Sequence, residues 1–135
     1  MKILALGGLL ILLAFGSCKK EKNMPEEHTA KTKVYKLTSV SNPWTNMDKA
    51  PDYVETITFY PDSTFLKTRI NGPEKLSVGG TYTITSLETE KFYKLSFNTE
   101  SSLTIYGGWL NIKTPQSLVY DITFVDGPRL IYTLQ

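Results

Sequence analysis

The chain has 135 residues, of which 41% are hydrophobic and 21% are charged, and its formal net charge is +2. From Lys33 onward ten Lys and Arg residues balance ten Asp and Glu residues, so the positive surplus belongs to the segment before Lys33. A neutral region of this size has room for one domain with its own core, and it lacks the basic cluster of a nucleic-acid-binding protein. We therefore expect one domain and no nucleic-acid partner.

Residues 1–17 have the features of a cleaved export signal. Lys2 precedes an almost wholly apolar stretch from Ile3 to Phe15, and Gly16 and Ser17 then provide the small residues that cleavage requires. This stretch is shorter than the roughly 20 apolar residues that a membrane-spanning helix needs. We predict a signal peptide over residues 1–17 that is absent from the mature protein.

The signal ends in Phe15-Gly16-Ser17-Cys18, a segment that resembles the lipobox of bacterial lipoproteins. The resemblance implies that Cys18 is acylated, becomes the first residue of the mature protein and anchors it to a membrane. Cys18 is the only cysteine of the chain, and an unpaired cysteine is unusual in an exported protein unless it is modified. The alternative is ordinary secretion with a free thiol.

Residues 18–32 are rich in Lys, Glu, Asn and Thr and contain hardly any apolar side chain. Such a segment buries too little surface to offset the entropy of ordering, so we interpret it as a flexible tether. The folded domain is then expected to span residues 33–135.

In this region apolar and polar residues alternate with a period of two, which is typical of half-buried strands. Turn residues such as Pro61-Asp62-Ser63 and Asp126-Gly127-Pro128 separate the runs, and no segment has helical periodicity. The predicted strands are 33–40, 54–60, 64–70, 79–85, 92–98, 102–112, 117–125 and 128–134.

Consecutive strands with short links favour an all-β fold, an eight-stranded up-and-down antiparallel barrel in which closure removes exposed edges. The Gly107-Gly108 pair leaves the strand count open. It suits a bend within one long strand, which we favour, or a two-residue hairpin turn that would give nine strands.

Three segments together resemble the small lipocalin-like lipoproteins of Bacteroidetes-type bacteria: Tyr35-Lys36-Leu37, Ile57 to Phe65 with its Pro-Asp turn, and Gly80 to Ile84. The closing hairpin from Leu118 to Leu134 adds to the likeness, which covers roughly residues 33–135. It implies a lipid-anchored protein of the cell envelope, in the outer membrane, with a lipocalin-like barrel and no enzymatic activity.

The chain offers little catalytic chemistry. His28 is the only histidine and lies in the predicted tether, so neither histidine-dependent catalysis nor a histidine-rich metal site is expected in the domain. Most carboxylates occupy expected turns or strand ends, which leaves a carboxylate-dependent hydrolase as the least favoured function. We expect no catalytic residue, no metal and no cofactor, and a monomeric protein.

Four residues are candidates for ligand binding: Trp44, Arg69, Tyr82 and Trp109. Trp44 lies in a long loop, Ser41 to Tyr53, that would either cap a binding cavity or, as we favour, place Trp44 as a plug in a filled barrel. Trp109 follows the glycine pair and would stack against Tyr106, more often as packing than as a binding surface.

The direction in which the Arg69 side chain points depends on strand register. If Pro61-Asp62-Ser63 is a three-residue loop, Phe59 faces Phe65 and Glu55 faces Arg69, so that Arg69 points inward and suits an anionic head group such as a fatty-acid carboxylate. A Glu55–Arg69 pair on the sheet surface is the favoured alternative. The function expected from these observations is binding of a small apolar or amphiphilic molecule; the alternative is a structural or protein-interaction module with a filled core.

Overall fold

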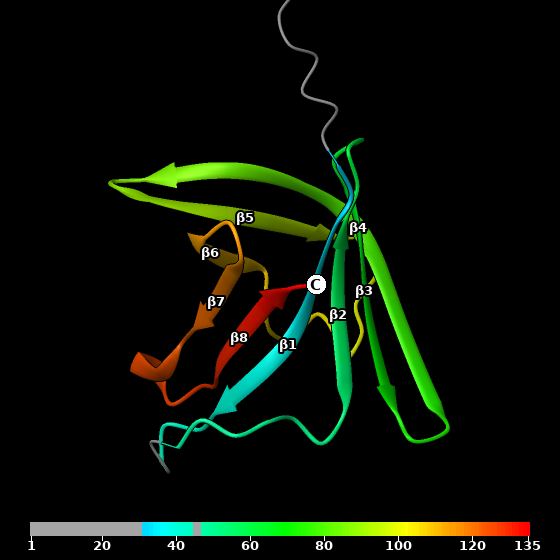
Figure 1. Cartoon of the computed structure of the whole chain (residues 1–135), viewed down its shortest axis with the longest axis vertical. Helices are drawn as coiled ribbons and strands as arrows, with labels where there is room; N and C mark the ends of the chain where they lie inside the picture. The colour runs from blue at the N-terminus through cyan, green and yellow to red at the C-terminus, as the bar shows by residue number, and fades with distance from the viewer. Residues whose placement is uncertain (1–30, 45–46) are drawn as a thin grey trace, which may run out of the picture.

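The computed structural model describes residues 31–44 and 47–135, in which eight antiparallel strands close into a barrel in chain order (Figure 1). The first strand pairs with the second on one edge and with the last on the other, which completes the closure. The strands are β1 (Lys33–Ser41), β2 (Val54–Phe59), β3 (Thr64–Asn71), β4 (Glu74–Leu87), β5 (Glu90–Phe97), β6 (Trp109–Thr114), β7 (Ser117–Asp121) and β8 (Arg129–Leu134), and a short 3-10 helix, η1 (Thr123–Val125), lies between β7 and β8.

The predicted all-β, up-and-down antiparallel barrel of eight strands is therefore confirmed. The predicted signal peptide, Cys18 and the tether up to residue 30 lie outside the described residues. Within residues 31–44 and 47–135, no helix is long and apolar enough to cross a membrane.

The hairpin of β2 and β3 has the register that its turn predicts. Phe59 pairs with Phe65, and Glu55 pairs with Arg69. The Asp62 carboxylate fixes the turn, because its Oδ1 accepts hydrogen bonds from the backbone N–H and the hydroxyl of Thr64, at 3.0 and 2.6 Å. This register directs Glu55 and Arg69 to the same side of the sheet as the two phenylalanines.

Inward-facing residues from all eight strands fill the barrel, as the period-two pattern of each strand requires. Gly80 of β4 belongs to this packing, since a Cβ at that position would collide with the Ser96 carbonyl and approach the Phe65 ring to 2.8 Å. The core consists of Tyr35, Leu37, Ile57, Phe59, Phe65, Tyr93, Leu95, Leu110, Leu118, Leu130 and Tyr132.

The predicted strand over residues 102–112 is wrong in its first half, because β6 begins only at Trp109. Residues 98–108 form a loop that the buried side chain of Leu103 anchors, while Ile105 stays 65% exposed. Gly107-Gly108 is neither a hairpin turn nor a bend within a strand; the pair ends this loop, and Gly107 has the positive φ of +93° that glycine adopts readily. The alternation of Leu103 and Ile105 imitates a strand, but only one of the two is buried.

The predicted strand over residues 117–125 is too long. It ends at Asp121, whose Oδ1 accepts hydrogen bonds from the backbone N–H and the hydroxyl of Thr123, at 3.0 and 2.7 Å. This local bonding turns the chain into η1, so Phe124 is 82% exposed instead of facing the core. In contrast, β4 (Glu74–Leu87) extends beyond both ends of its predicted range, 79–85, and its hairpin with β5 projects past the barrel (Figure 1).

Candidate functional site

Aromatic rings fill the part of the barrel interior around Phe59. Its ring stacks on that of Tyr93 with centroids 4.2 Å apart, and the rings of Tyr35 and Tyr82 meet it edge-on at 5.9 and 5.0 Å. Burial raises the pKa of Tyr35 to about 12, so the phenol stays neutral to a higher pH than an exposed tyrosine does. The Tyr82 hydroxyl donates to the carbonyl of Tyr60 at 2.9 Å. Tyr82, a predicted ligand-binding residue, is thus part of this packed cluster.

A network of charged and polar side chains occupies the interior around Glu55. The Glu55 carboxylate is fully buried and accepts hydrogen bonds from Arg69 Nε at 2.7 Å and from the Tyr132 hydroxyl at 2.5 Å. Lys67 Nζ lies 3.3 Å from Glu55 Oε1 and donates to the carbonyl oxygens of Leu103 and Tyr106, at 3.0 and 3.1 Å. Each charge therefore has partners, as buried charges require.

The network also ties the loop of residues 98–108 to the barrel, since the ammonium group of Lys67 holds two of the loop's carbonyls. Burial lowers the pKa of Lys67, and the charge of Glu55 opposes that shift. Burial and the nearby Glu55 carboxylate raise the pKa of Tyr132 well above its usual value. The single carboxylate of Glu55 thus lies between two basic side chains, Lys67 and Arg69.

Arg69 lies at the outer end of this network. Its side chain is 26% exposed, and its guanidinium carbon lies 4.4 Å from the centroid of the Tyr53 ring. The pair with Glu55 is therefore formed inside the barrel rather than on the sheet surface, so the favoured surface interpretation is wrong. Arg69 faces inward as the register predicts, but Glu55 already provides its counter-ion.

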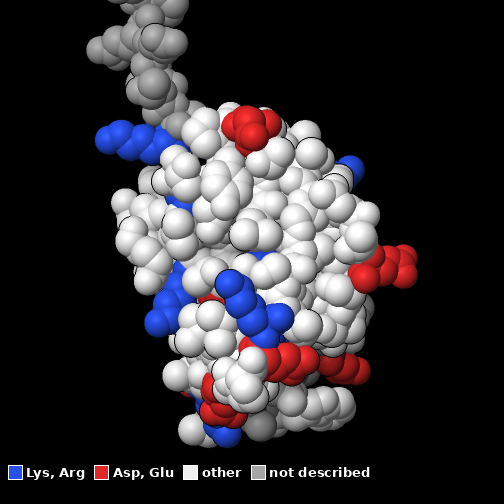
Figure 2. Space-filling view, turned by 90° about the vertical axis from the view of Figure 1, so that its right-hand side faces the viewer, with Lys and Arg blue, Asp and Glu red and all other residues white. Residues whose placement is uncertain are grey.

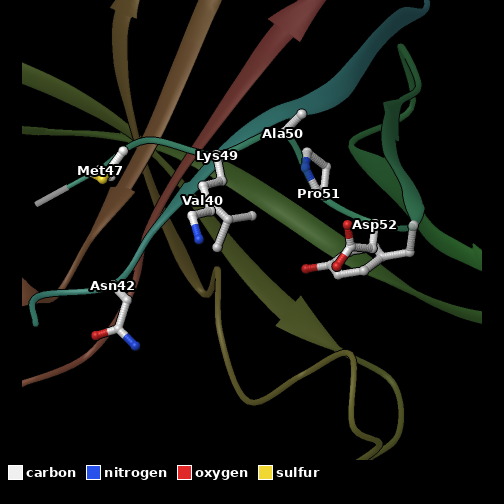
Figure 3. Close-up of a pocket in the computed structure, with 8 residues that line it drawn as sticks. Val40, Asn42, Met47, Lys49, Ala50, Pro51 and Asp52 are labelled. Carbon is white, nitrogen blue, oxygen red and sulfur yellow. The ribbon is translucent and has the colours of Figure 1, made fainter. Parts of the chain in front are cut away.

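A pocket of about 310 Å³ lies beside Tyr53, between the end of β1 and the loop that leads to β2. A bridge between Val40 and Lys49 supports it, with backbone hydrogen bonds of 2.8 and 2.9 Å. Figure 3 shows Val40 and Lys49 close together, with Met47 on one side and Pro51 on the other. The lining residues are Val40, Asn42, Met47, Lys49, Ala50, Pro51, Asp52 and Tyr53. The loop that the sequence singles out thus forms a small, mainly apolar pocket with a polar rim.

Trp44 and Trp109 do not lie in this pocket. Trp44 is 78% exposed, so it does not plug the mouth of the barrel, contrary to the favoured interpretation. Trp109 is 45% exposed on the outer surface, and its ring contacts Phe92 instead of Tyr106, which contacts Tyr120. The structure brings Arg69 close to Tyr53 and the loop pocket, but it places Trp44, Tyr82 and Trp109 elsewhere.

Lys67 and Tyr132 are the site residues that sequence reasoning missed. Lys67 carried a signal, because the predicted register placed it beside Ile57 on the inward side, and an inward lysine needs buried partners. Tyr132 had none, since an inward tyrosine at that position is typical of any barrel core.

On the face shown in Figure 2, Lys and Arg side chains are interspersed with Asp and Glu, and uncharged residues cover most of the upper half. Within residues 31–44 and 47–135, no three His, Cys, Asp or Glu side chains are grouped closely enough to hold a metal ion. Comparisons of the chain with known protein families, with curated proteins and with solved structures find no match. The eight-stranded closed barrel is compatible with a lipocalin-like fold.

Proposed function

We propose that this protein is a lipoprotein of the bacterial cell envelope, anchored to the outer membrane through Cys18, whose lipocalin-like barrel binds a small apolar or amphiphilic molecule without catalysing a reaction. The lipobox-like segment supports the anchor, and the closed barrel supports the family resemblance. The protein acts as a monomer and needs neither a cofactor nor nucleic acid.

The pocket beside Tyr53 carries the binding proposal. Its volume of about 310 Å³ lies at the lower end of the range for small-molecule sites, and its apolar lining and polar rim match an amphiphile. Because core side chains fill the barrel itself, we place the ligand at the mouth of the barrel rather than inside it. The partly exposed guanidinium of Arg69, 4.4 Å from the centroid of the Tyr53 ring, favours an anionic head group there.

Titration with a fluorescent fatty acid tests this site. Met47 lines the pocket and is 63% exposed, so Met47→Glu puts a charge into the pocket without disturbing the core. We expect a loss of affinity of at least tenfold. Ile84→Glu is the matched control, because Ile84 is similarly exposed at 59% but lies on β4 and does not line the pocket. Equal affinities of the Met47→Glu variant and the unsubstituted protein would remove the pocket from the proposal.

The anchor needs its own experiment. We expect Cys18→Ala to release the protein from membranes, because the acyl chains attach at that residue. Membrane pelleting after a high-salt wash checks this. A substituted protein that still pellets would contradict the lipoprotein assignment while leaving the pocket proposal untouched.

The second candidate is a structural or protein-interaction module, which the filled interior favours through contacts such as the Phe59–Tyr93 stack. Native mass spectrometry of protein from its own host separates the two. A copurified small molecule supports binding. Protein that carries no copurified molecule and also fails to bind the fatty acid supports a role as an interaction module.

A further inference from the structure

A groove of about 470 Å³ runs over the outer face of β5, β6 and β7, apart from the loop pocket. Strand register sets Phe92, Asn111 and Val119 in one row across these strands, and Val119 is buried beneath the groove. An ion pair lies on either side of the row, Glu90 with Lys113 at 2.6 Å and Asp121 with Arg129 at 3.7 Å. The groove is thus built from a regular sheet surface with aromatic, amide and charged side chains.

Two aromatic residues of this groove are unusually exposed. The indole of Trp109 is 45% exposed, although Phe92 meets it edge-on at 6.1 Å and Lys94 Nζ lies 5.2 Å from its centroid. Both contacts hold the ring in a defined orientation. Phe124, from η1, is 82% exposed and also lines the groove. Large aromatic surfaces that stay in water beside a hollow are typical of binding sites.

The exposure of Phe124 is fixed by the backbone around it. The N–H of Val125 and the N–H of Gly127 both donate to the Ile122 carbonyl, at 3.0 and 3.1 Å, and Asp121 holds Thr123 from the other side. A Cβ at position 127 would collide with the Ile122 side chain, so the turn closes tightly. A hydrogen-bonded turn therefore presents a phenylalanine to solvent.

We propose that this groove binds a neutral oligosaccharide whose pyranose rings carry equatorial substituents. A pyranose with equatorial substituents has flat C–H faces that pack on aromatic rings such as Trp109 and Phe124, and hydroxyl groups along its edge. The side chains between and beside the aromatics, Asn111 and the two ion pairs, supply both donors and acceptors for those hydroxyls. A purely apolar ligand would remove these charged groups from water without offering them hydrogen bonds.

The two-tryptophan composition of the chain gives a direct test. Trp44→Phe leaves Trp109 as the only tryptophan, and its emission then reports on the groove alone. We expect cellotetraose or chitotetraose to change that emission saturably. No saturable change with either sugar, or a saturable change with decanoate alone, would overturn the proposal.

Calorimetry with the better sugar locates the site. Trp109→Ala and Phe124→Ala should each weaken binding at least tenfold. Leu66→Ala, a substitution of a partly exposed residue on the outer face of β3, should leave it unchanged. Phe124 is 82% exposed, so Phe124→Ala decides the question if Trp109→Ala does not fold. Unchanged affinity in Phe124→Ala would overturn the proposal.

Discussion

The interior of the barrel has two regions that are stabilised in different ways. Around Phe59, aromatic rings pack against one another with their buried tyrosines uncharged. Around Glu55, four residues from three strands share hydrogen bonds and charge, and each depends on the others. Glu55 and Phe59 are only four residues apart on β2. One short strand, β2, thus contributes both to an apolar core and to a polar network. In the network, removing one partner leaves a buried charge without its counter-ion.

Alkaline pH should have the largest effect, because it acts on both regions. In the unfolded chain a tyrosine has a pKa of about 10, whereas burial raises the pKa of Tyr35 to about 12 and that of Tyr132 well above its usual value. Above about pH 10 the unfolded state therefore binds fewer protons than the folded state, and stability falls as pH rises. Tyr35 alone accounts for about 3 kcal/mol once its folded pKa is passed.

Lys67 shifts stability in the opposite direction. Its folded pKa is lowered, so the unfolded state binds more protons just below about pH 10.5, and stability rises there with pH. The pKa values of Tyr53, Tyr82 and Tyr93 are raised as well, so the tyrosines outweigh this one lysine. Urea unfolding followed by circular dichroism at several pH values measures the net effect of these groups on the free energy of unfolding. A free energy of unfolding that stays constant between about pH 9 and pH 11.5 would contradict it.

Phe59→Ala tests the aromatic region. Phe59 contacts four other aromatic rings, so its truncation leaves a cavity that the rigid barrel fills poorly. We expect the free energy of unfolding to fall by about 4 kcal/mol. The control is Phe124→Ala, because the exposed Phe124 should cost less than about 0.5 kcal/mol. Similar losses in the two variants would show that the ring cluster is not a packed core.

Glu55→Gln tests the polar region with almost no change of volume. The amide keeps the shape of the carboxylate but leaves Lys67 and Arg69 without their counter-ion, for an expected loss of about 3 kcal/mol. Adding Lys67→Met removes one of the two cations that Glu55→Gln leaves without a counter-ion. The double variant should therefore be more stable than Glu55→Gln alone. Additive losses in the double variant would mean that the two charges do not interact.

Lys67→Met alone should have the smallest effect on global stability, about 2 kcal/mol, because Arg69 still neutralises Glu55. Its local effect is larger. The carbonyls of Leu103 and Tyr106 lose their donor, so amide hydrogens in residues 98–108 should exchange faster than in the unsubstituted protein, while those of the strands change less. Unchanged exchange in this loop would show that Lys67 does not hold it against the barrel.

The sequence by itself determined the fold class, the strand order and the register of the first hairpin. Period-two alternation is a local property, and the Pro61-Asp62 turn sets which residues of β2 and β3 face each other. Strands β6 and β7 were predicted less well, because Leu103 and Phe124 continue the alternation past the point where pairing stops. Alternation shows which residues are apolar, whereas a strand also requires a neighbouring strand for its backbone hydrogen bonds.

Only the tertiary structure decided which side chains share a site. Tyr132 meets Glu55 across 77 sequence positions, and Lys67 reaches Leu103 across 36. No local pattern encodes such pairs, because they arise when closure brings β8 beside β1 and the loop of residues 98–108 against the interior. The tertiary structure also decided that Trp44 and Trp109 remain on the outside, since the number of inward positions in a filled barrel is limited.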